Sequence, residues 1–201
     1  MAGLATPSET RSVNGNSSDV FLSLRNVSKR YGGVAALENV SFDVRRSETH
    51  AVMGENGAVV FFTCNHCPYV VGSEPRIENA ANIAISGGLG FAGINSNDPV
   101  MYESDSWDNM VKRASRGMTY PYLHDATQEV AISYGAERTP EFYLIDSDFQ
   151  VVYRGRMDDS PRDPSHATTS ELPDAIAQML SGDAISVPRT DSIGCSVKWK
   201  A

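Results

Sequence analysis

The pattern of apolar and polar positions changes at Ala58. Before this residue, alternation over 20–31 and 32–46 predicts two strands around a turn, and residues 49–54 a third, so a small β unit is expected. After it, the short and continuously apolar run "AVVFF" is typical of a strand buried on both faces. Residues 1–19 are rich in Ser, Asn, Gly and Thr without periodicity, which predicts a disordered leader.

Beyond this strand, helical and strand patterns alternate. Because proline is tolerated in the first turn of a helix, Pro68 predicts a helix that opens around Cys67 and runs toward Ala80. The further predicted elements are a strand over 88–96, helices over 104–115 and 125–135, a two-stranded hairpin over 141–155, and a helix over 169–182 with Pro173 in its first turn. This order predicts an α/β fold with a central mixed β-sheet flanked by helices, preceded by the small N-terminal β segment.

Charge and hydropathy narrow the classes of partner. The chain of 201 residues has a net charge of −8, and the negative excess lies after residue 57. Such a surface argues against nucleic acid or an anionic membrane as a partner. No run approaches the roughly 18 apolar residues of a membrane helix, and the N-terminus lacks the basic start and apolar core of a secretory signal. A cytoplasmic protein is therefore expected.

Candidate chemistry lies at the end of the buried strand, where Cys64 and Cys67 form a C-x-x-C motif. A strand that leads into a helix N-terminus directs backbone N–H groups and the positive end of the helix dipole at Cys64, which lowers the pKa of its thiol. Cys64 is therefore predicted to be the nucleophile, and Cys67, one helical turn inside, the thiol that resolves a mixed disulfide. The imidazole of His66 is expected to stabilise the thiolate further.

A zinc site is the alternative interpretation of the two cysteines. Zinc needs about four ligands, and no matching C-x-x-C or H-x-x-H pair occurs among the remaining candidates, which are His50, His66, His124, His166 and Cys195. We therefore predict no metal and no cofactor. Cys195, near the C-terminal end, is interpreted either as a second resolving thiol or as a small buried hydrophobic residue.

Five segments share a known pattern: "FTCNHCPYV", "INSNDP", "GMTYPYLHDATQEVAISYGAERTPEFYLID", "YRGRMDDSPRDP" and "IGCSVKWK". On these segments, residues 58–201 resemble the thioredoxin-like superfamily, in particular its peroxiredoxin-like branch of small redoxins. The resemblance implies a thioredoxin-like fold with a cis-proline opposite the cysteines, and Thr139 and Pro140 are the matching residues. A cis bond there would free the backbone of Thr139 to pair with an extended substrate beside the sulfurs.

The same resemblance keeps peroxide reduction open as an alternative activity. A peroxidase of this kind would need a hydroxyl three residues before its thiolate, and an arginine nearby. Phe61 occupies that position and Thr63 adjoins Cys64 instead, which favours dithiol exchange. Arg138 and Arg154 are the arginines that could lie near the site, although solvated surface charges are the preferred interpretation of both.

The N-terminal part resembles a different family. Residues 22–58, "LSLRNVSKRYGGVAALENVSFDVRRSETHAVMGENGA", resemble the start of an ABC-transporter ATPase of the sugar-import type. The resemblance implies that Tyr31 would stack on adenine and that Gly54 and Gly57 would belong to the phosphate loop. A working loop ends in G-K-[ST], because the lysine contacts the terminal phosphates and the hydroxyl holds magnesium. Residues 59–61 are "VVF" instead, so ATP hydrolysis is not expected.

The two resemblances meet near Ala58, which predicts a fusion. Its parts would be the leader 1–19, an incomplete ATPase-like β segment over 20–57, and a redoxin domain over 58–201. Redoxins usually have a β-hairpin before the active-site strand. The β segment is predicted either to replace that hairpin by pairing with the redoxin sheet, or to remain a loosely attached appendage.

Two classes of function remain open. The first is a thiol-disulfide oxidoreductase that acts on protein or small-molecule disulfides and thiols and is restored by a cellular dithiol reductant. The second is a binding module that keeps the thioredoxin-like fold while its dithiol is inert. Turnover of a disulfide substrate, together with the pKa of the Cys64 thiol, distinguishes the two classes.

Overall fold

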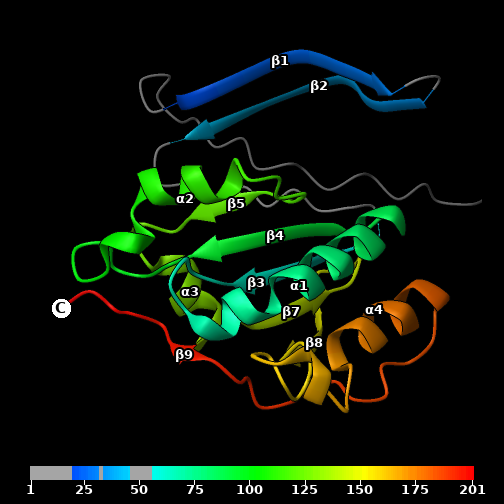
Figure 1. Cartoon of the computed structure of the whole chain (residues 1–201). Coiled ribbons are helices and arrows are strands. Elements are labelled where there is room, and N and C mark those ends of the chain that lie inside the picture. Colours follow the sequence, from blue (N-terminus) through cyan, green and yellow to red (C-terminus); the bar gives the residue numbers. More distant parts are fainter. Residues whose placement is uncertain (1–19, 32–33, 46–55) are drawn as a thin grey trace, which may run out of the picture. The chain divides into compact units, whose positions relative to one another are not determined.

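The computed structural model describes residues 20–31, 34–45 and 56–201 (Figure 1). The chain divides into two compact units, Met1–His50 and Ala51–Ala201, and each is described by itself. The predicted leader and the predicted third strand lie outside the described residues. The second unit contains both cysteines of the C-x-x-C motif.

The described part of the first unit is a β-hairpin. Strand β1 (Val20–Tyr31) pairs antiparallel with β2 (Val34–Arg45), and the two form a two-stranded sheet of their own. The two strands that alternation predicted in this part of the chain are therefore confirmed.

The second unit is built on a mixed sheet of five strands in the order β5-β4-β3-β7-β8. β4 runs parallel to both β3 and β5, whereas β7 runs antiparallel to both β3 and β8. The predicted central mixed sheet is thereby confirmed. The five strands are β3 (Ala58–Phe62), β4 (Gly90–Asn95), β5 (Tyr122–His124), β7 (Glu141–Ile145) and β8 (Val151–Gly155). A separate pair, β6 (Arg138–Thr139) and β9 (Cys195–Ser196), is antiparallel.

Strand β3 is buried along its whole length because helices cover both faces of the sheet (Figure 1). Val59 and Phe61 pack in a cluster with α1 and α4 on one face, whereas Val60 and Phe62 pack with α3 on the other. This two-sided burial explains why the run is continuously apolar rather than alternating. The helices are α1 (Pro68–Ser86), α2 (Trp107–Ala114), α3 (Glu129–Tyr134) and α4 (Glu171–Ser181), with 3-10 turns η2 (Glu103–Asp105) and η3 (Pro164–His166).

Helix α1 is longer than the sequence predicted. It continues past Ala80 to Ser86 and includes Pro75, because its buried face extends through Ile77 and Ala84. Packing of that face against the sheet outweighs the helix-breaking tendency of the internal proline. The long helix fixes the position of its own N-terminus, where the candidate cysteines lie.

Three other predictions differ from the structure in detail. The helix predicted over 104–115 is divided, because Ser106 has an extended backbone between η2 and α2. The helix predicted from residue 125 begins only at Glu129, since Gln128 has a left-handed backbone with φ of 66°. Strand β5 was not predicted, because three residues are too few to show alternation.

Candidate redox site

Both candidate cysteines are completely buried beyond the end of β3. Cys67 is the N-cap residue of α1, directly before Pro68, and Cys64 lies outside the helix altogether. The prediction that Cys67 lies one helical turn inside was therefore wrong. Since the helix begins after Cys67, the backbone N–H of Val70 in its first turn is among the groups that lower the pKa of the Cys67 thiol.

The two thiols shift each other's pKa in opposite directions. The hydrogen bond from Cys64 is the largest effect that lowers the pKa of Cys67, and the Cys195 side chain and the backbone N–H groups of Cys195 and Val70 lower it further. The same hydrogen bond, followed by burial, raises the pKa of Cys64, and the negative charge of Asp105 raises it more. The pKa of Cys67 is thus lowered and that of Cys64 is raised, which is opposite to the direction expected for Cys64.

Thr139 contacts both sulfur atoms. Its peptide bond to Pro140 is cis, as the resemblance implied. Its hydroxyl oxygen lies 3.5 Å from Cys64 Sγ, and its carbonyl oxygen accepts a hydrogen bond from Cys67 Sγ at 3.1 Å. The contact with the Thr139 carbonyl favours the protonated form of Cys67. The hydrogen-bond donors around Cys67 favour its thiolate form instead, and they outnumber this one acceptor. Thr139 therefore holds the two sulfurs in place beside β6.

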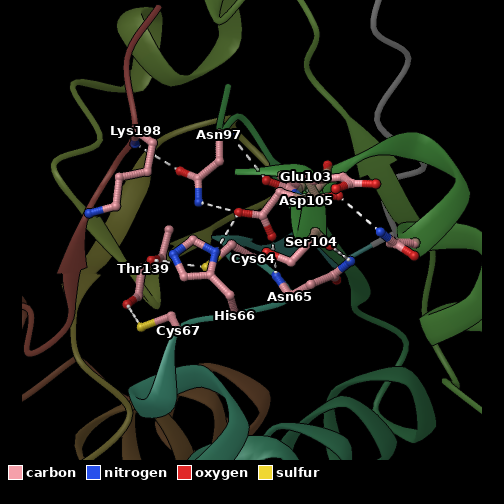
Figure 2. Close-up of polar contacts among 12 residues, drawn as sticks. Cys64, Asn65, His66, Cys67, Asn97, Glu103, Ser104, Asp105, Thr139 and Lys198 are labelled. Atoms are coloured by element: carbon pink, nitrogen blue, oxygen red, sulfur yellow. Dashed lines mark hydrogen bonds and ion pairs between the residues drawn. The ribbon is translucent and has the colours of Figure 1, made fainter. Parts of the chain in front are cut away.

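Asp105 is a site residue that sequence reasoning did not find. This carboxylate is fully buried at the end of η2, and its Oδ1 accepts a hydrogen bond from the backbone N–H of Asn65 at 2.6 Å (Figure 2). Its Oδ2 accepts from Asn97 Nδ2 at 2.8 Å and from His66 Nδ1 at 2.7 Å. Three donors from two separate segments thus satisfy a buried charge beside the cysteines.

His66 is held on two sides. Besides its hydrogen bond to Asp105, its ring stacks on Tyr102, with centroids 4.8 Å apart and an interplanar angle of 8°. Because Nδ1 donates to the carboxylate, a positive charge on the ring would be shared with Asp105. The predicted stabilisation of a Cys64 thiolate by His66 is opposed by Asp105, whose charge raises the pKa of Cys64.

The same groups are the one metal-binding combination among the described residues. Donor atoms of Cys64, His66 and Asp105 lie within 4.8 Å of one another, and sulfur, imidazole and carboxylate all suit zinc. Both oxygens of Asp105 already accept hydrogen bonds, however, so the carboxylate is engaged with donors of the protein itself. The geometry favours a hydrogen-bonded network, and the absence of a metal stays a prediction.

The features expected of a peroxidase are only partly present. Phe61 is buried in the core, and Arg154 pairs with Glu141 at 2.8 Å. Arg138 donates to the carbonyl of Gly194 at 3.3 Å. Among the hydrogen bonds and ion pairs of the described residues, none joins an arginine to the sulfur of the C-x-x-C motif. A hydroxyl was expected three residues before Cys64, at the position of Phe61. In the structure the Thr139 hydroxyl lies beside Cys64 instead.

The residues that the resemblance to an ATPase singled out do not form a site within the described part of the chain. Tyr31 is the last residue of β1, in the first unit, and Gly54 lies outside the described residues. Gly57 directly precedes β3 in the second unit, where its carbonyl oxygen accepts a hydrogen bond from Gly90 N at 2.9 Å. Its observed backbone contact is therefore with the sheet that presents the cysteines.

The order of the five strands, with the dithiol at the N-terminus of α1 and the cis-proline beside it, defines a protein of the thioredoxin-like class. A thioredoxin-like protein solved in its oxidised form shares this fold, with a TM-score of 0.51 at 15% identity over 66% of this chain and 82% of that one. The model of the Redoxin family matches residues 28–171, and the chain belongs to that family. An uncharacterised conserved protein from Geobacillus kaustophilus is 39% identical, with a TM-score of 0.69, over 80% of this chain and 84% of its own.

A short N-terminal stretch matches a different group of proteins. The xylose import ATP-binding protein of Thermoanaerobacter pseudethanolicus is 54% identical over 41 residues, which are 20% of this chain. The chain spans only 8% of the length of that relative. The Redoxin match begins at residue 28, inside the ATPase-like stretch, and the predicted domain boundary at Ala58 stays a prediction. None of the helices in the described part of the chain is long and apolar enough to cross a bilayer.

Proposed function

We propose that the chain is a thiol-disulfide oxidoreductase in which Cys64 bonds to the substrate sulfur and Cys67 resolves the mixed disulfide. The observation that supports this most is the pair of buried thiols at the N-terminal end of α1, both of which contact Thr139. Membership of the Redoxin family supports redox chemistry in general. Protein or small-molecule disulfides are the substrates, and a cellular dithiol is the reductant.

The exchange proceeds in two displacements. Cys64 loses its proton and attacks one sulfur of a substrate disulfide, and the other substrate sulfur leaves as a thiolate and takes up a proton. The Cys67 thiolate then attacks the Cys64 sulfur, which forms the Cys64–Cys67 disulfide and releases the second substrate thiol. Two electrons pass from the dithiol to the substrate, and a cellular dithiol returns them by the reverse sequence.

The directions of the two pKa shifts support these roles. A thiol of lower pKa leaves faster in thiol-disulfide exchange, so a reductant that attacks the protein disulfide displaces Cys67 more easily than Cys64. The mixed disulfide then forms on Cys64, and the reverse reaction uses the same intermediate. A stabilised Cys67 thiolate also favours the reduced pair, which makes the protein disulfide more oxidising.

The Cys64 proton needs an acceptor, because the pKa of this thiol is raised. The ring of His66 and the carboxylate of Asp105 lie within 4.8 Å of its sulfur. Since His66 Nδ1 donates to Asp105, the other ring nitrogen is the proton acceptor in this proposal. Asp105 fixes the tautomer and orientation of the ring.

An insulin-reduction assay with dithiothreitol, combined with thiolate absorbance, tests the proposal. We expect turnover above that of dithiothreitol alone, and a thiolate that titrates well below the usual value of about 8.5. Because the lowered pKa belongs to Cys67, the thiolate persists as pH falls below that value and disappears only in acid. The Cys67→Ser variant should lose this acidic titration. No turnover, with all thiols titrating near the usual value, would instead identify an inert binding module.

Peroxide reduction is the second candidate, and the Thr139 hydroxyl 3.5 Å from Cys64 Sγ is the observation that favours it. The Cys64 thiolate would attack one peroxide oxygen, become a sulfenic acid and release water, and Cys67 would then form the disulfide with loss of a second water. The lack of an arginine bonded to either sulfur, among the described residues, ranks this activity below dithiol exchange.

A further inference from the structure

The three cysteines of the chain differ in access to solvent. Cys64 and Cys67 have no exposed surface, whereas Cys195 is partly exposed. Exchange with an external thiol requires that one sulfur be reached from outside. Cys195 is the thiol of the three that already meets this condition.

The C-terminal segment 194–200 is held firmly against the site. β9 pairs with β6 so that Cys195 lies opposite Thr139, the residue that contacts both buried sulfurs. On the C-terminal side of this pair, Val197 is buried and its backbone N–H donates to the carbonyl of Glu137 at 3.0 Å. β9 therefore occupies the backbone edge of Thr139 that was expected to be free to pair with an extended substrate, and that expectation is corrected.

Contacts on both sides of β9 fix its position. A side chain at Gly194 would begin only 2.2 Å from the Thr139 carbonyl oxygen, so glycine permits the close approach that precedes Cys195. Further along, Lys198 N donates to Asn97 Oδ1 at 2.8 Å, and Gln128 Nε2 donates to the Lys198 carbonyl at 2.9 Å. Asn97 also donates to Asp105, so the segment is tied to the polar network of the site (Figure 2).

Cys195 lies beside the two buried thiols. Its side chain packs against the cluster formed by Cys64, Cys67 and Val70. Within that cluster its thiol interacts with Cys67, whereas the Cys64 thiol interacts with Cys67 and Thr139. Cys67 is therefore the buried thiol with which Cys195 is expected to bond.

Oxidation of the buried pair changes the surroundings of Cys195. In the reduced protein, burial and then the hydrogen bond and negative charge of Cys67 raise the pKa of Cys195 to about 11. A disulfide between Cys64 and Cys67 removes the last two effects, because the Cys67 sulfur is then uncharged. The positive charges of Lys198 and Arg138, which lower the pKa of Cys195, remain. Cys195 becomes easier to deprotonate when the pair is oxidised.

Building on the proposed function, we propose that Cys195 is a third redox thiol that passes oxidation from the buried pair to the surface. The Cys195 thiolate attacks the Cys67 sulfur of the Cys64–Cys67 disulfide, so the Cys67–Cys195 bond forms as the Cys64–Cys67 bond breaks. Because the pKa of the Cys64 thiol is raised, Cys64 takes up the proton that Cys195 lost as it leaves, with no net change in electrons. An external dithiol then attacks Cys195, displaces the Cys67 thiolate, and departs as its own disulfide, which leaves all three cysteines reduced.

Disulfide mapping of the Cys64→Ser variant tests the contact without requiring turnover. Oxidation with diamide, acid quenching, alkylation and peptide mass analysis should give a Cys67–Cys195 disulfide in most of the molecules. The matched control combines Cys64→Ser and Cys195→Ser with Ser196→Cys, which moves the thiol one position along β9 to the opposite face. This control should leave Cys67 open to alkylation. Alkylation of Cys67 and Cys195 in the Cys64→Ser variant, or equal linkage in the control, would overturn the proposal.

The rate of reduction separates this relay from the proposed function. Wild-type protein oxidised with one equivalent of diamide should show both disulfides on mapping. Cys195→Ser should form only Cys64–Cys67, and dithiothreitol should reduce it at least tenfold more slowly than wild type. If Cys195→Ser is reduced at the wild-type rate while insulin turnover is intact, the relay is wrong and the oxidoreductase stands. If insulin turnover is absent but Cys64→Ser still links Cys67 to Cys195, only the proposed function fails.

Discussion

Replacing Cys67 with serine should abolish the turnover of insulin disulfides and leave substrate attached to Cys64. Serine cannot attack the mixed disulfide, so the intermediate accumulates instead of resolving. Removal of a residue that forms a covalent bond in the reaction commonly costs on the order of a thousandfold or more in rate. We therefore expect the rate to fall to that of dithiothreitol alone, and mass spectrometry of the unreduced protein to show an adduct on Cys64.

The Cys64→Ser variant is the matched control for this trapping experiment. It should lose turnover to the same extent, because no sulfur remains to bond to substrate at that position, but it should form no adduct at residue 64. An adduct on Cys195 in the Cys67→Ser variant, with Cys64 free, would show that Cys195 rather than Cys64 bonds to the substrate first, which contradicts the proposal. Turnover by Cys67→Ser above one tenth of the wild-type rate would rule out Cys67 as the resolving thiol.

The parts of this molecule that the sequence predicted well are those specified locally. The continuous apolar run before the cysteines predicted a strand covered on both faces, and the structure packs Val59 and Val60 into clusters on opposite faces. The C-x-x-C motif and the proline after it predicted a helix that begins at the dithiol. The helix begins at Pro68, close to the predicted start, so Cys67 is its N-cap residue rather than a residue one turn inside.

The parts that the sequence could not predict depend on contacts between distant segments. Asp105 lies in a stretch whose local pattern predicted an ordinary helix, and nothing nearby in the sequence indicates that its carboxylate meets His66. The Thr139 hydroxyl approaches Cys64 across 75 positions of the chain. Cys195 was left between two interpretations because its pairing with Thr139 follows from the register of two strands of two residues each, which leave no periodicity to detect.

Gly57 shows how a residue from one sequence motif can meet a different structural requirement. The resemblance to an ATPase implied a phosphate-loop glycine, but here its φ is +115° and a side chain would begin 2.1 Å from the carbonyl oxygen of Ile145. Backbone atoms cannot yield as a flexible side chain can. Gly57→Ala should therefore combine an unfavourable backbone conformation, about 1–3 kcal/mol, with overpacking of about 1–3 kcal/mol. For a chain of this size we expect the melting temperature to fall by roughly 10 °C.

Gly117→Ala is the control that separates these two costs. Its φ of +105° is close to that of Gly57, yet no atom lies within 4 Å of the position that a Cβ would take. The variant therefore bears the conformational cost alone, and its melting temperature should fall by about half as much or less. Thermal unfolding followed by circular dichroism measures both. Equal shifts would mean that the sheet accommodates a methyl group beside Ile145, and that Gly57 is required only for its backbone conformation.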